Sequence, residues 1–578
     1  MEKLTTLNWK IVAKAGEGVM ASAKLFAKAL KRHGWSAFTY YEYPSLIKGG
    51  LQSGQVYASA AAGAATCQRR VVDVLIVFHE KLLTDCLDQI GPETVVLLNA
   101  NRFEASKFPE LSVPVLPVNL GKIARSLGAN PLAANIAALG VSAYVYGMDL
   151  GIIARAIADE FASKPAVVKQ NLEVFKAAYE AAQAQQLPVL GQITVVPDQQ
   201  LLVSGAEAVG LGALAAGVQF YSGYPMTPST GLLHFLAEQQ DHYPIVVKHA
   251  EDEIAAINHA LGASFAGVRA MTGSSGGGFA LMVESLSFAG VAELPLVVLE
   301  AMRQGPATGL PTWTSQGDLN FVLTAGHGDF LRVVLTPGSV AEHFALSKLA
   351  LELAEKYQLP VLILSDKFIL ESLQTMPQLE TTQQNQRLSL VAEGRLGESG
   401  LAEGSYLRYA DTPNGISPRA IPGQTHTLQL TNSYEHDQYG FAIEDAVGTK
   451  QAVDKRARKL ASLVQELPPP VYLGAAQPKH LLVSFGSTVN VLEELLRQPK
   501  AQQVGVIHLP CVWPFPTAEF ERLVDQAAAP TFTVIEGNAT GQLAGLIRRE
   551  SKYRDFTSYL RYDGRPFYVE DIMEHLQL

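Results

Sequence analysis

Dense apolar runs in the first third of the chain alternate with stretches in which apolar residues recur at helical spacing. The runs have the length and composition of strands and fall at residues 9–15, 36–43, 71–78, 94–100 and 113–118. Helical spacing marks residues 20–32, stopped by Gly34, and residues 166–183. Apolar strands separated by helices are typical of a parallel sheet covered on both faces. The pattern predicts an α/β domain over residues 1–190, followed by a linker at 186–200.

The same alternation returns twice. A second unit, predicted over 200–370, opens with a helix at 205–217, and its strands fall at 218–222, 245–249, 268–272, 294–300, 330–335 and 359–365. A third unit is predicted over 476–578, with strands at 480–486, 503–509 and 531–537. Residues 371–475 are rich in Gln, Glu, Gly, Ser and Pro, which predicts an extended connecting segment over the surface of this chain or a partner. Because 578 residues exceed a single core, the predicted fold class is multidomain α/β.

Composition narrows the class of protein. Hydrophobic residues make up 48% of the chain and charged residues 17%, which excludes a mostly disordered chain and favours large sheets and an extensive subunit interface. The net charge of −10 is spread without a basic stripe, so nucleic acid is not an expected partner. The most apolar window, residues 131–148, is broken by Asn135, Gly140 and Ser142. It predicts buried helices rather than a membrane span.

The cysteines and the N-terminus indicate a compartment. Cys67, Cys86 and Cys511 lie far apart, which excludes a disulfide scaffold and favours three buried thiols in a reducing cytoplasm. The first ten residues lack a signal-peptide pattern, which agrees with a cytoplasmic protein. A [4Fe–4S] cluster takes four thiolates, so this chain cannot hold one by itself. No metal ligands are predicted in it.

Glu253 is the first candidate for chemistry. It follows the apolar run at 245–249 and opens a helical pattern rich in small residues. In thiamine enzymes a carboxylate at such a strand-to-helix junction bonds the aminopyrimidine nitrogen and favours the tautomer that removes the thiazolium C2 proton. The alternative is that Glu251, Asp252 and Glu253 only complement the dipole at the start of a helix.

Two neighbouring segments add hydroxyls and bare backbone. In YPMTPST, which begins at Tyr224 and Pro225, two prolines flank Thr227, and its hydroxyl or that of Ser229 can cap the next helix or face a ligand. The loop GSSGGG, at 273–278, follows a predicted strand and offers backbone donors to an anion or a cofactor ring. The alternatives are a plain helix cap and a flexible connection.

The segment RQGPATGLPT follows the predicted strand at 294–300. Ligands of open parallel sheets bind at the carboxyl ends of the strands, which is where this segment begins. The planar guanidinium of Arg303 suits a bidentate grip on the carboxylate of a 2-oxoacid, and Thr308 and Thr312 supply hydroxyls. A surface arginine in a turn is the alternative.

These segments, in this order, carry a family resemblance. Together with EHDQYGFAIED at 435–445 and VIEGNATGQLAGLIR at 534–548, they resemble the α subunit of 2-oxoacid:ferredoxin oxidoreductases, particularly 2-oxoglutarate:ferredoxin oxidoreductase. GEGV at 16–19 and EYPSLIKGG at 42–50 resemble the γ domain that this family often fuses ahead of α. The resemblance covers nearly the whole chain.

The resemblance implies domains and residue roles. Residues 1–190 become the γ domain, 200–370 the thiamine diphosphate pyrimidine-binding domain, 371–475 the connecting segment and 476–578 a transketolase C-terminal-like domain. It implies catalytic roles for Glu253, Arg303 and Thr227. It also implies cofactor contacts for Glu253, Tyr224, Pro225, Thr227, Ser275 and Gly276. Substrate contacts are implied for Arg303, Thr308 and Thr312, whereas Glu536, Asn538 and Gln542 are expected at an interface.

Two features bear on substrate and partner. Gln304 and Ala307 stand where the family usually has Gly and Ser, which leaves the substrate preference open. A diphosphate half-site needs a Gly-Asp-Gly start to hold Mg²⁺, and the sequence contains no such string. Diphosphate binding, Mg²⁺ and [4Fe–4S] are therefore expected in a β subunit, joined to this chain as (αβ)₂.

The N-terminal unit leaves an alternative open. Residues 16–21 with Glu42 meet the dinucleotide fingerprint, so a non-catalytic NAD-binding or assembly protein is the rival from another class. In the resembling family the γ domain is instead associated with coenzyme A. Lys48, Gly49 and Gly50 could bring a cation and bare backbone to a CoA phosphate or to the partner, or form a tight turn.

The function expected on these grounds is CoA-dependent oxidative decarboxylation of 2-oxoglutarate to succinyl-CoA. Electrons would pass to ferredoxin, and a low-potential donor could run the reaction backward. Pyruvate, branched-chain and aryl-pyruvate specificities are the alternatives within the same group.

Overall fold

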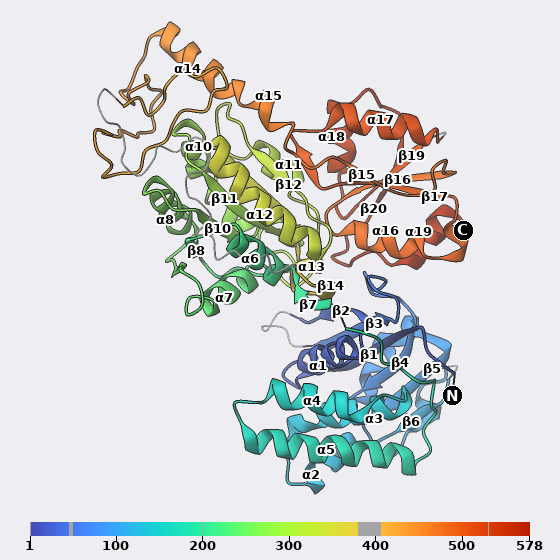
Figure 1. Cartoon of the computed structure of the whole chain (residues 1–578). Helices are drawn as coiled ribbons and strands as arrows, with labels where there is room; N and C mark the ends of the chain where they lie inside the picture. Colours follow the sequence, from blue (N-terminus) through green and yellow to red (C-terminus); the bar gives the residue numbers. More distant parts are fainter. Residues whose placement is uncertain (1, 45–49, 112, 199, 380–405, 530) are drawn as a thin grey trace.

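The computed structural model describes residues 2–44, 50–111, 113–198, 200–379, 406–529 and 531–578, whose strands form three sheets (Figure 1). The N-terminal domain contains an eight-stranded sheet in the order β6-β5-β4-β1-β3-β2-β14-β7. Its own elements are β1 (Thr6–Lys14), α1 (Val19–Arg32), β2 (Ser36–Glu42), β3 (Leu51–Ser59), β4 (Val72–Val77), β5 (Ile90–Leu98), β6 (Val115–Pro117), α2 (Leu120–Ser126), α3 (Ala134–Val145), α4 (Leu150–Glu160) and α5 (Pro165–Ala184).

The prediction of a wholly parallel N-terminal sheet was wrong. Strands β6, β5, β4 and β1 are parallel, but β3 runs antiparallel to both β1 and β2. Parallel neighbours need a long crossover, usually a helix, whereas β2 and β3 follow each other with only residues 43–50 between them. The sheet is therefore mixed.

Two strands from beyond this domain complete its sheet. The strands β7 (Gln200–Ser204) and β14 (Leu373–Pro377) pair antiparallel with each other, and β14 pairs with β2 through Gln374 and Phe38. These segments flank the second unit in sequence. Both ends of that unit are thus tied by backbone hydrogen bonds to the N-terminal sheet.

The most apolar window of the sequence forms a buried helix. Helix α3 packs against α5 so closely that a methyl group at Gly140 would lie 2.3 Å from the carbonyl oxygen of Phe175. On the α3 helix, Ser142 accepts a hydrogen bond from the Trp9 indole at 2.9 Å. Within the described ranges, no helix is both long and apolar enough to cross a membrane.

The middle domain contains a seven-stranded sheet in the order β18-β12-β13-β11-β10-β8-β9. Six strands are parallel, and β18, from the C-terminal domain, is antiparallel to β12. The elements are α6 (Gly205–Ala215), β8 (Phe220–Gly223), α7 (Thr230–Glu238), β9 (Val246–His249), α8 (Glu253–Phe265), β10 (Ala270–Ser274), α9 (Gly276–Phe279), α10 (Val283–Val291), β11 (Leu296–Met302), α11 (Leu319–Thr324), β12 (Val333–Leu335), α12 (Val340–Tyr357), β13 (Pro360–Asp366) and α13 (Lys367–Glu371).

The C-terminal domain lies beside the middle one (Figure 1). Its sheet has the order β15-β17-β16-β19-β20. The elements are β15 (Val471–Gly474), β16 (His480–Phe485), α16 (Thr488–Leu496), β17 (Val504–Leu509), β18 (Cys511–Trp513), α17 (Thr517–Ala527), β19 (Phe532–Glu536), α18 (Gln542–Glu550), β20 (Thr557–Leu560) and α19 (Val569–Leu576). All three cysteines of the chain are free and buried, as the sequence predicted.

In the sequence between these two domains, helices α14 (Ala446–Arg458) and α15 (Leu460–Leu463) extend along the top of the middle domain (Figure 1). A cluster of buried charged side chains holds α14 against the middle domain. The carboxylate of Glu293 lies 2.6 Å from Lys455 Nζ and 2.6 Å from Lys459 Nζ, and the three side chains are 2–4% exposed. Arg408 donates to the Glu293 carbonyl at 2.7 Å. Burial lowers the pKa of Lys455 to about 8, while Lys459 and Lys455 hold the pKa of Glu293 well below its usual range.

We predict that Glu293→Gln lowers the free energy of unfolding by about 3 kcal/mol or more, because breaking a buried pair leaves its cations without a carboxylate. Thermal unfolding of the purified protein measures the change. Glu180→Gln is the matched control, since Glu180 pairs with Lys176 at the surface, where 60–75% of each side chain is exposed. Equal losses in the two variants would contradict the prediction.

Candidate functional site

The parallel course of the strands brings the sequence motifs together at one edge of the middle sheet. Strands β8, β9, β10 and β11 are neighbours in the sheet and run parallel, so the segments that leave their carboxyl ends meet there. YPMTPS follows β8, Glu253 follows β9, the glycine loop follows β10, and Arg303 follows β11. Four stretches spread over about ninety residues of sequence therefore form one site.

The three acids before α8 have different environments. Asp252 is the N-cap, and its side chain accepts from the Ala255 N–H at 2.8 Å. Glu251 is exposed and lies 3.8 Å from Lys248. Glu253 turns inward and is only 4% exposed. Dipole complementation therefore explains Asp252 and does not explain the burial of Glu253.

Glu253 is buried against the glycine loop. A methyl group at Gly278 would lie 2.4 Å from Glu253 Oε1 and 2.1 Å from Ser274 Oγ, so only glycine fits there. Oε1 has no hydrogen-bond partner in the part of the chain that the structure describes. Because an orphaned buried oxygen is unfavourable, a ligand N–H is the natural partner for it. The aminopyrimidine of thiamine diphosphate has the chemistry to supply one.

The hydroxyls near Glu253 are not helix caps. Ser229 occupies the N-cap of α7, but its hydroxyl donates to the Met226 carbonyl at 2.8 Å and makes no capping bond, so the alternative of a plain helix cap does not hold for Ser229. Ser275 precedes α9, is fully buried, and its Oγ has no partner among the described residues. The glycine loop continues directly into α9 rather than forming a long flexible connection. Tyr224 and Pro225 lie exposed at the start of the same edge.

Arg303 links two of the motifs. Its Nη1 donates to the Thr227 carbonyl at 2.9 Å, which joins the segment after β11 to the segment after β8. No ion pair to Arg303 is present in the described ranges, and burial lowers its pKa, only partly offset by the negative charge of Asp318. A half-buried guanidinium with open donors and no counterion is suited to an anionic ligand.

The rest of the arginine segment folds back on itself. Leu310 N–H donates to the Gln304 carbonyl at 2.8 Å, and a methyl group at Gly309, whose φ is 51°, would lie 2.0 Å from that oxygen. Thr312 is buried with an unpartnered Oγ1 in the described structure, whereas Thr308 is exposed at the tip of the loop. The structure therefore offers the Thr312 hydroxyl as an internal donor and turns Thr308 toward solvent.

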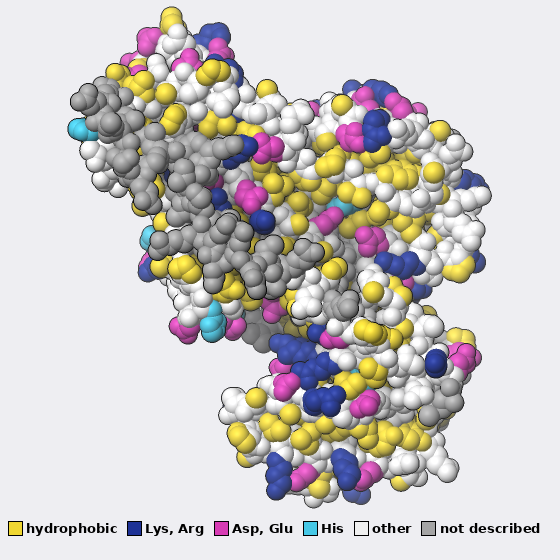
Figure 2. Space-filling view, viewed as in Figure 1, with side chains coloured by type: hydrophobic (Ala, Val, Ile, Leu, Met, Phe, Trp, Pro, Cys, Tyr) yellow, Lys and Arg dark blue, Asp and Glu magenta, His cyan; other side chains and the backbone are white. Residues whose placement is uncertain are grey.

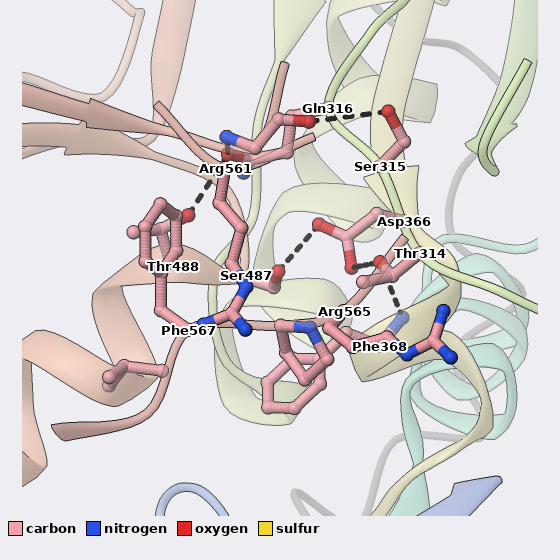
Figure 3. A pocket seen from close by; sticks show the side chains of 13 residues that line it. Thr314, Ser315, Gln316, Asp366, Phe368, Ser487, Thr488, Arg561, Arg565 and Phe567 are labelled. Carbon is pink, nitrogen blue, oxygen red and sulfur yellow. Dashed lines mark hydrogen bonds between the residues drawn. The ribbon is translucent and has the colours of Figure 1, made fainter. Parts of the chain in front are cut away.

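The C-terminal domain fixes the base of this segment (Figure 3). Gln316 Oε1 accepts from the Thr488 hydroxyl at 3.0 Å and from the Gly537 N–H at 2.8 Å. Gln542 Nε2 donates to the Gly317 carbonyl at 2.7 Å, and Asn538 Nδ2 donates to the Gln316 carbonyl at 3.1 Å. These contacts place Asn538 and Gln542 at the interface that the sequence resemblance implied for them.

A small polar cavity of about 30 Å³ lies at the same junction (Figure 3). Asp366 accepts from the Ser487 hydroxyl at 2.5 Å and from the Thr314 hydroxyl at 3.4 Å. Burial raises the pKa of Asp366 to about 6 in spite of these donors. The sequence does not reveal this residue, because an aspartate at the end of an apolar strand looks like an ordinary helix cap.

Sequence reasoning also missed two acids beside Arg303. Glu300, at the end of the run LPLVVLE, is fully buried, and burial raises its pKa well above the usual range, reinforced by Asp318. Asp318 also has a raised pKa, chiefly through burial. The only sequence signal is a glutamate within an otherwise apolar strand, next to a candidate substrate arginine.

The N-terminal motifs fit a dinucleotide site poorly. Strands β1 and β2 are separated in the sheet by β3, whereas the fingerprint requires adjacent parallel strands joined by the helix. Glu42, its candidate ribose ligand, is bound to Lys10 at 3.1 Å and to the Ser53 hydroxyl at 2.9 Å. Lys48 and Gly49 lie outside the described residues. Gly50 adjoins β3 with φ 131°.

Charged side chains of both signs are spread over the face shown in Figure 2. On its coloured part, acidic and basic side chains are interspersed, and several Lys and Arg side chains lie together on the N-terminal domain.

The fold and the unpartnered oxygen of Glu253 fit a thiamine diphosphate-binding α/β protein. Residues 211–455 match the family model described as "Pyruvate flavodoxin/ferredoxin oxidoreductase, thiamine diP-bdg". Residues 8–181 match the model described as "Pyruvate ferredoxin/flavodoxin oxidoreductase". The 2-oxoacid:ferredoxin oxidoreductase subunit alpha of Sulfolobus sp is 31% identical, with 99% of this chain and 96% of the relative covered. The chain belongs to the 2-oxoacid:ferredoxin oxidoreductase family, as an alpha subunit.

Two further matches concern the substrate. The 2-oxoglutarate synthase subunit KorA of Archaeoglobus fulgidus is 41% identical over 197 residues, which cover 34% of this chain and 57% of the relative. A solved 2-oxoglutarate:ferredoxin oxidoreductase from Magnetococcus marinus, with 2-oxoglutarate, coenzyme A and succinyl-CoA bound, superposes with a TM-score of 0.89. It is 29% identical, and the match covers 99% of each chain.

We predict that Asp366→Asn stabilises the protein at pH 8 and not at pH 3.5. The folded-state pKa of about 6 exceeds the ordinary 3.8, so the stability that Asp366 contributes is complete below 3.8 and is lost as pH rises through 6. The gap corresponds to about 3 kcal/mol. The difference in unfolding temperature between variant and wild type should grow from pH 3.5 to pH 8. The exposed Asp241→Asn is the control. A constant difference across the pH range would contradict the prediction.

Proposed function

We propose that this chain is the alpha subunit of a CoA-dependent 2-oxoglutarate:ferredoxin oxidoreductase. The reaction converts 2-oxoglutarate, CoA and two oxidised ferredoxins into succinyl-CoA, CO₂, two reduced ferredoxins and a proton, and a low-potential donor could reverse it. The observation that carries the proposal is the match over 99% of the chain to an enzyme solved with 2-oxoglutarate, coenzyme A and succinyl-CoA bound. The unpartnered Oε1 of Glu253 supports it from within the molecule.

The residues at the site fit thiamine diphosphate. Glu253 Oε1 would accept from the aminopyrimidine, and the bare backbone of Gly276 and the buried hydroxyl of Ser275 would lie beside it. When bound, the cofactor supplies a carbanion for the keto carbon and holds the electrons left by the loss of CO₂. Glu253 would hold or release the proton that this chemistry needs, in a site that the glycine loop keeps narrow.

Arg303 is proposed to hold the 2-oxoacid. Its open donors can grip a carboxylate while Nη1 stays on the Thr227 carbonyl, so the substrate is oriented against a fixed backbone. The Thr312 hydroxyl would donate from the buried side of the same segment. Thr308, at the exposed tip of the same loop, is proposed as a further substrate contact.

A second subunit is proposed to complete the site. Large apolar side chains are exposed around Glu253, with exposed fractions of 39% for Tyr224, 50% for Ile254 and 51% for Leu281. Exposed apolar groups rimming a polar site favour a protein interface there. The proposed partner is a β subunit that supplies Mg²⁺, the diphosphate site and [4Fe–4S], in an (αβ)₂ heterotetramer that reduces ferredoxin in the cytoplasm. The domain boundaries at 190, 370 and 475 are part of the same proposal.

Coenzyme A is proposed to reach the site from the N-terminal domain. Gly50, which follows Lys48 and Gly49 in sequence, has no side chain, so its backbone is open to a close approach by a ligand. Its φ of 131° is one that residues with a side chain rarely adopt.

We predict that Glu253→Ala abolishes turnover in the complex reconstituted with its β subunit, with kcat falling by at least about 100-fold, because the proton relay to the cofactor is lost. Steady-state oxidation of 2-oxoglutarate measures kcat, and calorimetry measures thiamine diphosphate affinity. Glu251→Ala, at the exposed neighbour, should retain wild-type turnover. Wild-type turnover in Glu253→Ala would remove the role proposed for Glu253.

A pyruvate-specific enzyme is the second candidate, because Gln304 and Ala307 alter the substrate segment. We predict that kcat/KM for 2-oxoglutarate exceeds that for pyruvate by about 100-fold or more, since a site that binds the second carboxylate rejects a substrate without it. Rates with pyruvate, branched-chain and aryl 2-oxoacids provide the comparison. Equal or higher kcat/KM for one of these would assign the enzyme to that acid instead.

A further inference from the structure

Glu300 is an unusual acid in the core of the middle domain. It lies in β11, three residues before Arg303, and has no exposed surface. Its register neighbours are Ser274 on β10 and Leu364 on β13, so its side chain belongs to the face of the sheet that lies beneath the glycine loop. Neither carboxyl oxygen meets a cation or a backbone donor in the described structure. An acid in such surroundings is neutral and can donate a proton.

Asp318 is the group that shares a side-chain hydrogen bond with Glu300. This residue precedes α11, but its side chain makes no capping bond to the helix. It lies against the glycine loop, where a methyl group at Gly276 would be 2.7 Å from Asp318 Oδ2. Asp318 is also the carboxylate that acts electrostatically on Arg303. The Asp318 carboxylate therefore lies among the glycine loop, the Glu300 carboxyl and the substrate arginine.

The neighbouring charges favour a proton on Glu300. Negative charge comes from Asp318 before α11 and from Asp366 at the end of β13, and both raise the pKa of Glu300. Arg303, the nearby cation, interacts with Asp318. A protonated carboxyl beside an ionised one forms a charge-assisted O–H···O⁻ bond, which is about twice as strong as a neutral one.

Asp318 and a substrate compete for the same donors. Arg303 Nη1 donates to the Thr227 carbonyl, and the charge of Asp318 acts on the guanidinium, yet no salt bridge joins Arg303 and Asp318 among the described residues. An Asp318 side chain turned toward Arg303 would occupy the guanidinium edge that a carboxylate ligand needs. For a substrate to bind there, the Asp318 carboxylate must be kept away from that edge of Arg303.

We propose that Glu300 is a positioning residue for substrate binding. Its proton holds the Asp318 carboxylate against Gly276, which keeps the guanidinium of Arg303 open for the carboxylate of the 2-oxoacid. The inference rests on the role proposed above for Arg303. It assigns substrate affinity to a residue that touches neither substrate nor cofactor.

The test uses three variants in the assembled enzyme. Glu300→Leu removes the donor at similar volume, Glu300→Gln keeps an N–H donor, and Glu300→Leu combined with Asp318→Asn removes both donor and competitor. We expect Glu300→Leu to raise KM for the 2-oxoacid by about tenfold, the effect of one competing ion pair of about 1.4 kcal/mol, with kcat changed by less than about threefold. Glu300→Gln should retain the wild-type KM within about threefold, and the double variant should recover it.

A purely structural role predicts other results. If Glu300 only fills the core, Glu300→Leu lowers the unfolding temperature without a selective rise in KM, or raises KM without recovery in the double variant, and either result overturns the proposal. If Glu300→Leu does not assemble, Asp318→Asn alone decides, because loss of the carboxylate beside Arg303 should lower KM by about two- to fivefold. An unchanged or higher KM in Asp318→Asn overturns the proposal.

Arg303→Gln separates this inference from the proposed function. If Arg303→Gln leaves KM at the wild-type value, the substrate role of Arg303 fails, and the inference fails with it. If Arg303→Gln raises KM and Glu300→Leu does not, the inference alone is wrong and the proposed function stands.

Discussion

Burial of the Glu253 carboxylate is the constraint around which the site is built. A buried oxygen without a hydrogen-bond partner is unfavourable by roughly 1–3 kcal/mol, so the fold retains Oε1 in that state only if function requires it. The surrounding sequence fits this requirement. Glycine at 278 leaves room for the carboxylate, and Asp252 caps the helix so that Glu253 is free to turn inward. The glycine loop and the acidic triplet are thus parts of one arrangement.

The same edge of the sheet couples the domains. Gln316 and Gly317, which follow the arginine segment, are held by Thr488, Asn538 and Gln542 of the C-terminal domain. The middle domain also contributes β7 and β14 to the N-terminal sheet, so its two ends are fixed by backbone pairing. An arginine on a connecting loop would ordinarily be mobile. Here its segment begins at a central strand and ends at a second domain, which restricts the motion of Arg303.

Much of this arrangement could be predicted from the sequence because the signals are local. Apolar runs located the parallel strands of the middle sheet, and the strand-to-helix position of Glu253 marked it as a candidate for chemistry. Nonlocal features could not be predicted in this way. The antiparallel course of β3 depends on a short connection, and the addition of β7 and β14 depends on an exposed edge of another domain. A helix cap was one alternative for the hydroxyl of Ser229, but this hydroxyl donates to the Met226 carbonyl instead.

The acids beneath the site were missed for a related reason. From the sequence alone, Glu300 looks like the polar end of a strand and Asp318 like a cap, and only the packing of α11 against the glycine loop brings them together. Their proximity changes how the charge of the site must be counted. Arg303 is one cation near Glu253, Asp318, Glu300 and Asp366, and four ionised carboxylates would repel an anionic substrate. Burial eases this conflict at Glu300, because it raises the pKa of that carboxyl well above its usual range and favours a proton there. Asp318 and Asp366 still act on Glu300 as negative charges. Under the role proposed for Arg303, affinity for a 2-oxoacid would depend on the Glu300 proton as well as on the guanidinium.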